Sequence, residues 1–300
     1  MNIPNSNQGI PLVSIITPSL NAARFIEQTI ESVLSQDYAH IEYTVMDGGS
    51  TDGTLEILDR YRGSIQYAVQ EDRGAADAVN RGFLRSHGAI FAWLSADDVY
   101  LPGAVSLAVS RFLAEPDAAV VYGEGRWVDE GGAVLGRYPT RAPYEPAMFA
   151  SECCLCQPAC FIRREAFADA GMLDTGLHSA FDYDLWIRLA GVHRFSFVPE
   201  DLASSRMHRA NKSLGARRLM FDESMAVLRR HYGYVPVKWI YGYLSFLRDS
   251  RDQFFEPLRE SVLTWLATLP AGIYYNHAHP WRHLKEWVSS TARRVGFSAR

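Results

Sequence analysis

The sequence predicts an α/β fold in which a mostly parallel sheet is flanked by helices and followed by a helical C-terminal appendage. Between residues 12 and 94, short β-rich runs alternate with segments of helical periodicity, which is typical of consecutive βαβ units. The chain has 300 residues, of which 48% are hydrophobic, so it is long enough for one large domain and apolar enough to bury a core.

Four strands and two helices are predicted in the first third of the chain. The strands are Leu12 to Thr17, Glu42 to Asp47, Ile65 to Gln70 and Ile90 to Leu94. Between them, Arg24 to Gln36 and Thr54 to Tyr61 each place their apolar residues on one face, as amphipathic helices do. Because strand and crossover helix repeat, we expect a doubly wound, nucleotide-binding type of sheet.

After residue 98 the pattern becomes more irregular. The Gly131-Gly132 pair predicts the turn of a polar hairpin. Further helices are expected at Gly103 to Ala114, Arg164 to Ala170 and Asp182 to Ala190, and further strands at Ala119 to Tyr122 and Phe195 to Val198. We expect the main domain to comprise residues 1–232 and the helical C-terminal extension to comprise residues 233–300.

The charge balance and the cysteines exclude some classes of protein. A formal net charge of -4 gives no electrostatic reason to expect a nucleic-acid partner. The first 20 residues lack a basic stretch followed by a long apolar one, so we expect no secretory signal and a cytoplasmic protein. The four cysteines lie together between Cys153 and Cys160, and in that compartment we interpret them as buried thiols.

The C-terminal extension differs from the rest of the chain in charge. From residue 235 onward, nine Lys and Arg residues stand against five Asp and Glu residues, so this segment is positive while the remainder is negative. Its apolar runs are too short, or interrupted by Pro270, to span a bilayer. Interleaved aromatic residues are Trp239, Tyr241, Tyr243, Trp281 and Trp287. We expect either a surface that lies on anionic lipid headgroups at the inner face of the plasma membrane, or a helical cap that packs on the main domain or on a second copy.

The segment DGGSTDGT, residues 47–54, follows a predicted strand and leads into a helix. Ligands of doubly wound folds gather at this edge of the sheet. Its glycines allow tight turns and close backbone approach, and the Asp47 carboxylate can accept hydrogen bonds from a nucleobase or a ribose. The alternative is a plain turn that caps the next helix.

The segment WLSADD, residues 93–98, ends a buried strand with two adjacent acids, Asp97 and Asp98. Adjacent carboxylates repel each other unless a positive charge lies beside them. A Mg²⁺ or Mn²⁺ ion held by aspartate oxygens, with a diphosphate supplying further ligands, meets this need. The alternative is that the pair caps the helix after Pro102.

Six segments in order make the chain resemble glycosyltransferase family 2 of the GT-A fold, over residues 12–213: VSIITPSLN, VMDGGSTDGT, QEDRGAADAVNRG, FAWLSADDVYLPG, QPACFIRREAF and FDYDLWIRLA. The resemblance implies an inverting hexosyltransferase that moves a sugar from a nucleotide diphosphate-sugar, UDP-linked in our expectation, to a hydroxyl acceptor. It implies Mn²⁺ or Mg²⁺ as cofactor, a glycan or lipid-linked glycan as acceptor, and a role in bacterial surface polysaccharide assembly.

The resemblance also implies which residues bind the donor and the metal. The nucleotide-sugar-binding residues would be Thr17, Pro18, Asp47, Arg73, Asp77, Arg81, Ser95 and Asp97. Asp97 matches the metal-ligating acid of the family's DXD motif, with Asp98 beside it and His208, in a basic loop, as a further ligand. Many members carry an acid two residues before Asp97, where this chain has Ser95, a poorer ligand.

The catalytic base implied by the resemblance is Asp182, in the segment FDYD. Position 181 is Phe where Glu is frequent in the family. Asp182 and Asp184 stand two apart and do not share a helix face, so at most one of them can point at the acceptor. The alternative role of Asp182 is to cap the helix.

Three other functions compete with glycosyl transfer. A sugar-phosphate nucleotidylyltransferase would carry a Gly-rich, Lys-containing phosphate loop near the N-terminus, which this sequence lacks. A glycoside hydrolase would leave the DGGSTDGT segment unexplained. A non-catalytic nucleotide- or sugar-binding module would bind UDP weakly, if at all, and would tolerate loss of Asp182.

Overall fold

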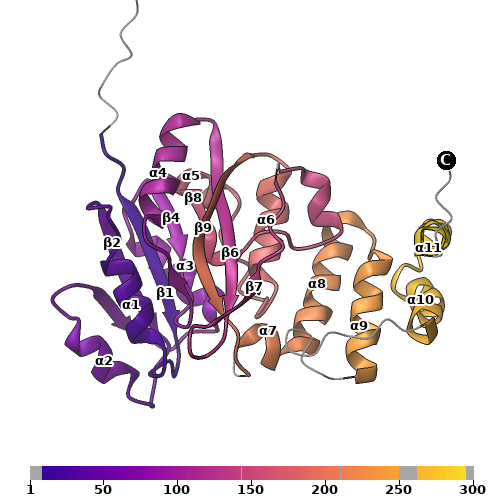
Figure 1. Cartoon of the computed structure of the whole chain (residues 1–300), viewed down its shortest axis with the longest axis horizontal. Helices are drawn as coiled ribbons and strands as arrows, with labels where there is room; N and C mark the ends of the chain where they lie inside the picture. The colour runs from indigo at the N-terminus through magenta and orange to yellow at the C-terminus, as the bar shows by residue number, and fades with distance from the viewer. Residues whose placement is uncertain (1–8, 143, 210, 250–261, 295–300) are drawn as a thin grey trace, which may run out of the picture. The chain divides into compact units, whose positions relative to one another are not determined.

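The structure is a computed structural model that describes residues 9–142, 144–209, 211–249 and 262–294. These residues form two compact units, each described here by itself (Figure 1). The first unit holds the described residues up to Glu145 together with Cys154–His208, and the second holds Pro146–Cys153 and those from Arg209 onward. The boundary expected at residue 232 lies inside the second unit.

A nine-stranded sheet forms the centre of the first unit. Its N-terminal half consists of parallel strands in the order β3-β2-β1-β4. They are β1 (Val13–Ser19), β2 (Ile41–Asp47), β3 (Gln66–Val69) and β4 (Ile90–Trp93). Each lies within two residues of its predicted position, and Ser19 pairs with Asp47, so the carboxyl ends of β1 and β2 lie side by side.

Helices pack on both faces of this sheet because its strands are apolar on both sides. In β4, the buried Ile90 and Ala92 belong to the core shared with α1 (Ile26–Leu34), α2 (Thr54–Arg60) and α4 (Ala104–Ala114). Phe91 and Trp93 alternate with them and contact rings of α3 (Ala75–Arg85), α5 (Arg164–Asp169) and α6 (Phe181–Ala190).

The second half of the sheet is mixed rather than parallel. Strand β8 (Cys160–Arg163) runs antiparallel to β4 and to β6 (Ala118–Val128), and β9 (Arg194–Arg206) runs parallel to β6. The short β5 (Val99–Tyr100) pairs antiparallel with β9, and β7 (Val134–Arg137) returns along β6 through the predicted Gly131-Gly132 turn. A 3-10 turn, η2 (Gln157–Ala159), precedes β8.

Two strands extend well beyond their predicted ends, since β6 has 11 residues and β9 has 13. The predicted strand ended at Tyr122, just before Gly123. In the sheet, a side chain at Gly123 would meet Leu202 of β9 at 2.4 Å, so the glycine lets the two strands pair closely. This pairing carries β9 to the same edge as the end of β4.

The second unit is helical. Its elements are η1 (Pro146–Ala150), α7 (Lys212–Gly215), α8 (Arg217–Tyr232), α9 (Val237–Asp249), α10 (Val262–Tyr275) and α11 (Pro280–Arg294). Phe221 and Met225 of α8 form one buried cluster with Ile240 and Tyr243 of α9, which is why α8 belongs with the C-terminal helices. In the described part of the chain, no helix is both long enough and apolar enough to cross a membrane.

The four cysteines are free thiols, as predicted. Cys154, Cys156 and Cys160 are buried, and Cys153 is half-buried. Burial raises the pKa of the Cys156 thiol, so this group stays protonated and unreactive at neutral pH.

Candidate active site

The residues singled out by sequence lie mainly where strands of the first unit end. The loops after β1, β2 and β4 leave the same edge of the parallel half-sheet. The end of β9 reaches this edge as well, because Ser204 pairs with Val99 just beyond the loop that follows β4. Four chain segments that are distant in sequence therefore meet at one edge.

Asp47 is buried and organises the loop after β2. Its Oδ1 accepts hydrogen bonds from the backbone N–H groups of Gly49 (3.0 Å) and Ser50 (2.7 Å). Its Oδ2 accepts from the hydroxyls of Ser50 (2.7 Å) and Ser19 (3.0 Å). Gly49 has a φ of +96°, a left-handed conformation that favours glycine. Asp47 thus shapes the loop, and a direct contact with a base would have to replace one of these bonds.

Thr17 and Pro18 occupy the end of β1 in different ways. The Thr17 side chain is fully buried, and its hydroxyl lies 2.9 Å from that of Tyr43 in β2. Burial raises the pKa of Tyr43, so this pair is neutral. Pro18 is half-buried at the strand end. Thr17 therefore belongs to the core beneath this edge of the sheet, and Pro18 is the more accessible of the two.

Asp77 ties together the cluster at the start of α3. Its carboxylate contacts the guanidinium groups of Arg81 (2.8 Å) and Arg73 (3.3 Å), and it accepts the Arg73 backbone N–H. Burial acts to raise the pKa of Asp77, but the hydrogen bonds from Arg73 and the charge of Arg81 outweigh it and lower the pKa. Arg81 also donates to the Glu71 carbonyl at 2.8 Å, whereas Arg73 stays largely exposed. Of these residues, Arg73 is the one placed to meet a ligand.

The two acids after β4 have different surroundings. The Asp98 backbone N–H closes a tight turn onto the Ser95 carbonyl, and its buried carboxylate accepts the backbone N–H of Arg206 at 2.8 Å. Burial and the neighbouring Asp97 charge raise the pKa of Asp98. Asp97 is 25% exposed, and its Oδ2 lies 2.9 Å from Nε2 of His208. Asp97, unlike the buried Asp98, thus places its carboxylate beside an imidazole.

Arg206 holds this loop in place, a role that the sequence analysis did not identify. Its Nε donates to the Asp97 carbonyl (3.0 Å), and its terminal nitrogens donate to the Glu130 carbonyl (2.9 Å) and to Oε1 of Gln28 (2.7 Å). The guanidinium also lies 4.8 Å from the ring centroid of Phe25. Its donors serve protein groups, so it acts as a clamp rather than as a ligand for a phosphate. The sequence offered no local signal for this clamp, because the predicted strand ended at Val198.

Asp97 and His208 fit a divalent cation in their chemistry. A carboxylate oxygen and an imidazole nitrogen are both common ligands of divalent ions. Within the described residues, no group of three or more His, Cys, Asp and Glu side chains gathers into a cluster that could hold an ion. A cation here would therefore depend on oxygens of a bound diphosphate and of water. Asp97 is the more exposed of the two acids, whereas Asp98 is buried.

Asp182 lies in the first turn of α6, half-buried, with its Oδ1 accepting the Tyr183 backbone N–H at 2.7 Å. One turn further along the same helix face, Trp186 stacks on Trp93, the last residue of β4, with ring centroids 5.7 Å apart. This stack fixes α6 against the strand whose end carries Asp97.

Asp184 lies on a different face of α6 and is buried in an ion pair. Its Oδ2 accepts the Arg188 Nε–H at 2.8 Å, and the same guanidinium donates to the carbonyls of Ala170 and Met172. These bonds tie α6 to the segment after α5. The structure thus separates the two acids of the FDYD segment into one accessible and one structural group.

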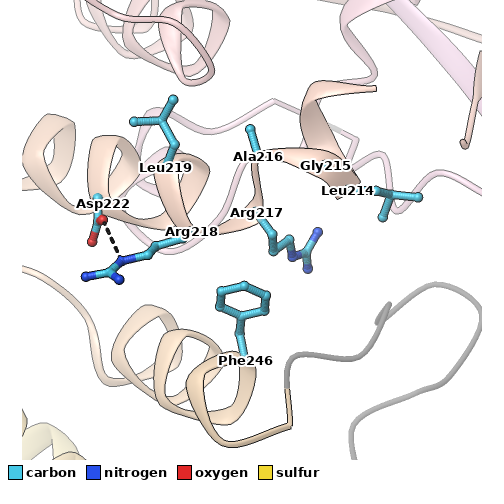
Figure 2. Close-up of a pocket in the computed structure, with 8 residues that line it drawn as sticks. All are labelled: Leu214, Gly215, Ala216, Arg217, Arg218, Leu219, Asp222 and Phe246. Carbon is cyan, nitrogen blue, oxygen red and sulfur yellow. Dashed lines mark ion pairs between the residues drawn. The ribbon is translucent and has the colours of Figure 1, made fainter. Parts of the chain in front are cut away.

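A pocket of about 540 Å³ lies in the second unit (Figure 2). Arg218 pairs with Asp222 across 3.7 Å, and Arg217 and Phe246 also border the pocket. Its lining consists of Leu214, Gly215, Ala216, Arg217, Arg218, Leu219, Asp222 and Phe246. None of the residues predicted to bind donor or metal borders it, and its one carboxylate is paired, so we place the candidate active site at the strand ends instead.

A parallel half-sheet that continues into a mixed half, with acids at its strand ends, defines a GT-A type of fold. The chain belongs to glycosyltransferase family 2, because a model of the family described as "Glycosyl transferase family 2" matches residues 14–171. The family and the fold class predicted from the sequence are thereby confirmed.

Curated relatives agree with this assignment. An uncharacterized glycosyltransferase of Rickettsia prowazekii is 32% identical over 214 residues, which cover 67% of this chain and 65% of that protein. Chondroitin synthase of Escherichia coli is 25% identical over 261 residues, which cover 84% of this chain and 37% of that protein. The chain spans only about a third to two thirds of the length of the curated relatives it matches first.

Solved structures share the fold at low identity. TarS 1–349 of S. aureus, in complex with UDP-GlcNAc, superposes with a TM-score of 0.62 at 16% identity, over 88% of this chain and 81% of that one. The mannosyltransferase PcManGT of Pyrobaculum calidifontis, in complex with GDP-Man and Mn²⁺, gives a TM-score of 0.54 at 17% identity, over 98% and 77%.

Proposed function

We propose that this glycosyltransferase transfers a hexose from a nucleoside diphosphate-sugar, UDP-linked in the first instance, to a hydroxyl of a glycan or lipid-linked glycan, with inversion. The observation that carries the proposal is the accessible Asp97 carboxylate beside His208, at the same sheet edge as the loop built on Asp47. The chondroitin synthase and hyaluronan synthase among the relatives support a role in polysaccharide assembly, and we propose a cytoplasmic location.

Leaving-group departure sets the first requirement of this reaction. Breaking the anomeric C–O bond builds positive charge on the sugar and negative charge on the diphosphate. Asp97 and His208 would hold Mn²⁺ or Mg²⁺, which supplies charge stabilisation at the departing phosphates. Arg73, exposed at the start of α3, is the cationic side chain of the donor cluster that is free to approach those phosphates. Arg206 keeps the Asp97 backbone in position through its bond to the Asp97 carbonyl.

Acceptor activation sets the second requirement. Asp182 accepts the proton of the attacking hydroxyl, because it is the accessible acid of α6 while Asp184 is bound to Arg188. Attack from the acceptor side, opposite the diphosphate, inverts the anomeric centre. Asp97, on the donor side, and Asp182, on the acceptor side, thus act on opposite ends of the reacting sugar.

A donor screen tests the proposal. Melting temperatures of the full chain are measured with UDP, GDP and their sugar conjugates, with Mn²⁺ and then with EDTA. A ligand that binds the native protein at 100 times its Kd stabilises it by about 2.7 kcal/mol. We expect one nucleotide family to raise the melting temperature, and EDTA to remove that rise.

Product analysis separates the rival functions. Release of nucleoside diphosphate that depends on a glycan acceptor is expected of the transferase. A binding module would give the thermal shift without release, and a nucleotidylyltransferase would instead consume a sugar phosphate together with a nucleoside triphosphate. Either of these results overturns the proposal.

A further inference from the structure

Helices α10 and α11 of the second unit turn large apolar side chains toward solvent. On α11, Trp281 is 75% exposed, and Leu284 and Val288 follow it at helical spacing, so the three form one stripe. On α10, the exposed apolar residues are Val262, Leu263, Leu266, Ile273 and Tyr274. We call these eight side chains the α10–α11 apolar surface.

The opposite face of α11 packs on α10 through polar contacts and a ring stack. His283 is fully buried and its Nε2 lies 3.1 Å from the Thr268 carbonyl of α10. Trp287 donates to the Thr268 hydroxyl at 3.0 Å, and its ring stacks on Trp265. Gly272 admits the His283 ring, which a side chain at that position would meet at 1.9 Å. The polar contacts hold the two helices together and leave the apolar stripes outside.

The charges of these two helices are almost all of one sign. Between residues 262 and 294 the sequence has one acid, Glu286, and it accepts hydrogen bonds from the Tyr234 hydroxyl (2.5 Å) and the Val237 backbone N–H (3.1 Å). The basic residues of the same range are Arg282, Lys285, Arg293 and Arg294. Arg282 and Lys285 are exposed on α11, with the Arg282 guanidinium 4.2 Å from the Tyr234 ring centroid, while the one acid is bound within the helical unit.

We propose that the α10–α11 apolar surface binds membranes that contain anionic phospholipids, with both helices lying in the plane of the headgroups. Amphipathic helices with aromatic and aliphatic residues on one side and basic residues nearby bind such interfaces. Each basic residue at an anionic surface adds to the attraction. A second copy is the poorer partner, because a symmetric contact would bring Lys285 and its basic neighbours toward their own equivalents. This inference is independent of the proposed transfer reaction.

Vesicle flotation of the full chain tests the inference. The vesicles contain phosphatidylcholine alone, or phosphatidylcholine mixed with phosphatidylglycerol. We expect the protein to float with the mixed vesicles and to do so much less with phosphatidylcholine alone. Lys285→Gln should weaken binding to the mixed vesicles by about fivefold, because one charge near the surface contributes about 1 kcal/mol.

Serine substitutions separate the apolar contribution from the charge. Trp281→Ser with Leu284→Ser should weaken vesicle binding by about tenfold or more, since each removes apolar area from the interface. The matched control is Leu84→Ser with Val192→Ser, two exposed apolar residues of the first unit, which should leave binding unchanged. Because all four side chains are exposed, melting curves should confirm that both variants fold.

Two results would overturn the inference. One is equal flotation of the wild type and the Trp281→Ser, Leu284→Ser variant. The other is a wild type that does not float but sediments as a dimer, which the same variant converts to a monomer, since the surface would then bind a second copy. Activity on a soluble acceptor, assayed in parallel, reports separately on the transfer reaction.

Discussion

The loop after β4 and the first turn of α6 each carry two acids close together in sequence, and in both regions one acid is buried while the other stays accessible. In α6, Arg188 binds the buried Asp184 directly, with Nε and Oδ2 2.8 Å apart. In the β4 loop, Arg206 donates its backbone N–H to the buried Asp98 carboxylate. Its guanidinium donates to backbone carbonyls and to Gln28 instead.

This difference shows how one residue type takes separate roles. The charge of Asp184 is neutralised at its own carboxylate, whereas burial and the nearby Asp97 raise the pKa of Asp98. In both regions the buried acid shapes the chain while its neighbour stays more accessible. In the proposed reaction Asp97 would serve the donor and Asp182 the acceptor.

The largest expected effect is that of Asp182→Asn. The substitution keeps size and hydrogen bonding but removes the proton acceptor, so turnover should fall by a factor on the order of 10² or more, with donor affinity little changed. Steady-state kinetics with calorimetry of donor binding measure both quantities. If the variant retains full turnover while Asp184→Asn abolishes transfer in a folded protein, the assignment of the base is wrong.

Asp97→Asn should weaken donor binding and turnover together, by about thirtyfold, because an amide is a poorer ligand for a divalent cation than a carboxylate. Calorimetry of the wild type and the variant, with Mn²⁺ and with EDTA, measures this. The variant should resemble the wild type in EDTA. Equal donor affinity of the wild type under both conditions would remove the metal from the mechanism.

Asp184→Asn should act on stability and not on chemistry. Replacing the buried partner of Arg188 leaves that guanidinium without its anion, which we expect to lower the free energy of unfolding by about 2 kcal/mol. Urea denaturation measures the change, and turnover per folded molecule should stay near that of the wild type. A stable variant with lost turnover would place Asp184 in the active site.

The smallest effect is expected for Asp98→Asn. Asparagine keeps the oxygen that accepts the Arg206 N–H, and a neutral side chain suits a buried position, so stability should change by less than about 1 kcal/mol. Binding of the donor with Mn²⁺ should be retained. If this variant loses metal-dependent binding as completely as Asp97→Asn, Asp98 is itself a ligand.

The parallel half of the sheet was predictable because local signals agree with the fold there. Each strand from Val13 to Trp93 is a short apolar run bounded by turn residues, and each intervening helix is amphipathic. In the mixed half, β9 contains Pro199 and two acids and β6 contains two glycines, features that locally disfavour strands. Their long-range pairing overrides those preferences, which a local pattern does not reveal.

The candidate site was likewise predictable only where its residues belong to local motifs. The sequence analysis selected Asp97 and Asp182 as candidate site residues, since their motifs are local, and it expected Asp182 and Asp184 to lie on different helix faces. It did not separate Asp97 from Asp98, because adjacent residues in a loop have no fixed period. Nor did it find the clamp by Arg206, which depends on the chain returning to the β4 loop from a strand more than a hundred residues later.

The late position of β9 has a consequence for biosynthesis. Val99 pairs with Ser204, and Asp97 meets His208, only after a very long loop has closed, and such non-local contacts form slowly. The region matched by the family model, residues 14–171, therefore emerges from the ribosome before Asp97 and His208 can meet. An interrupted or prematurely released chain would carry Asp97 without its histidine and without its clamp. We therefore expect a chain that ends within the sheet to lack the proposed transfer activity.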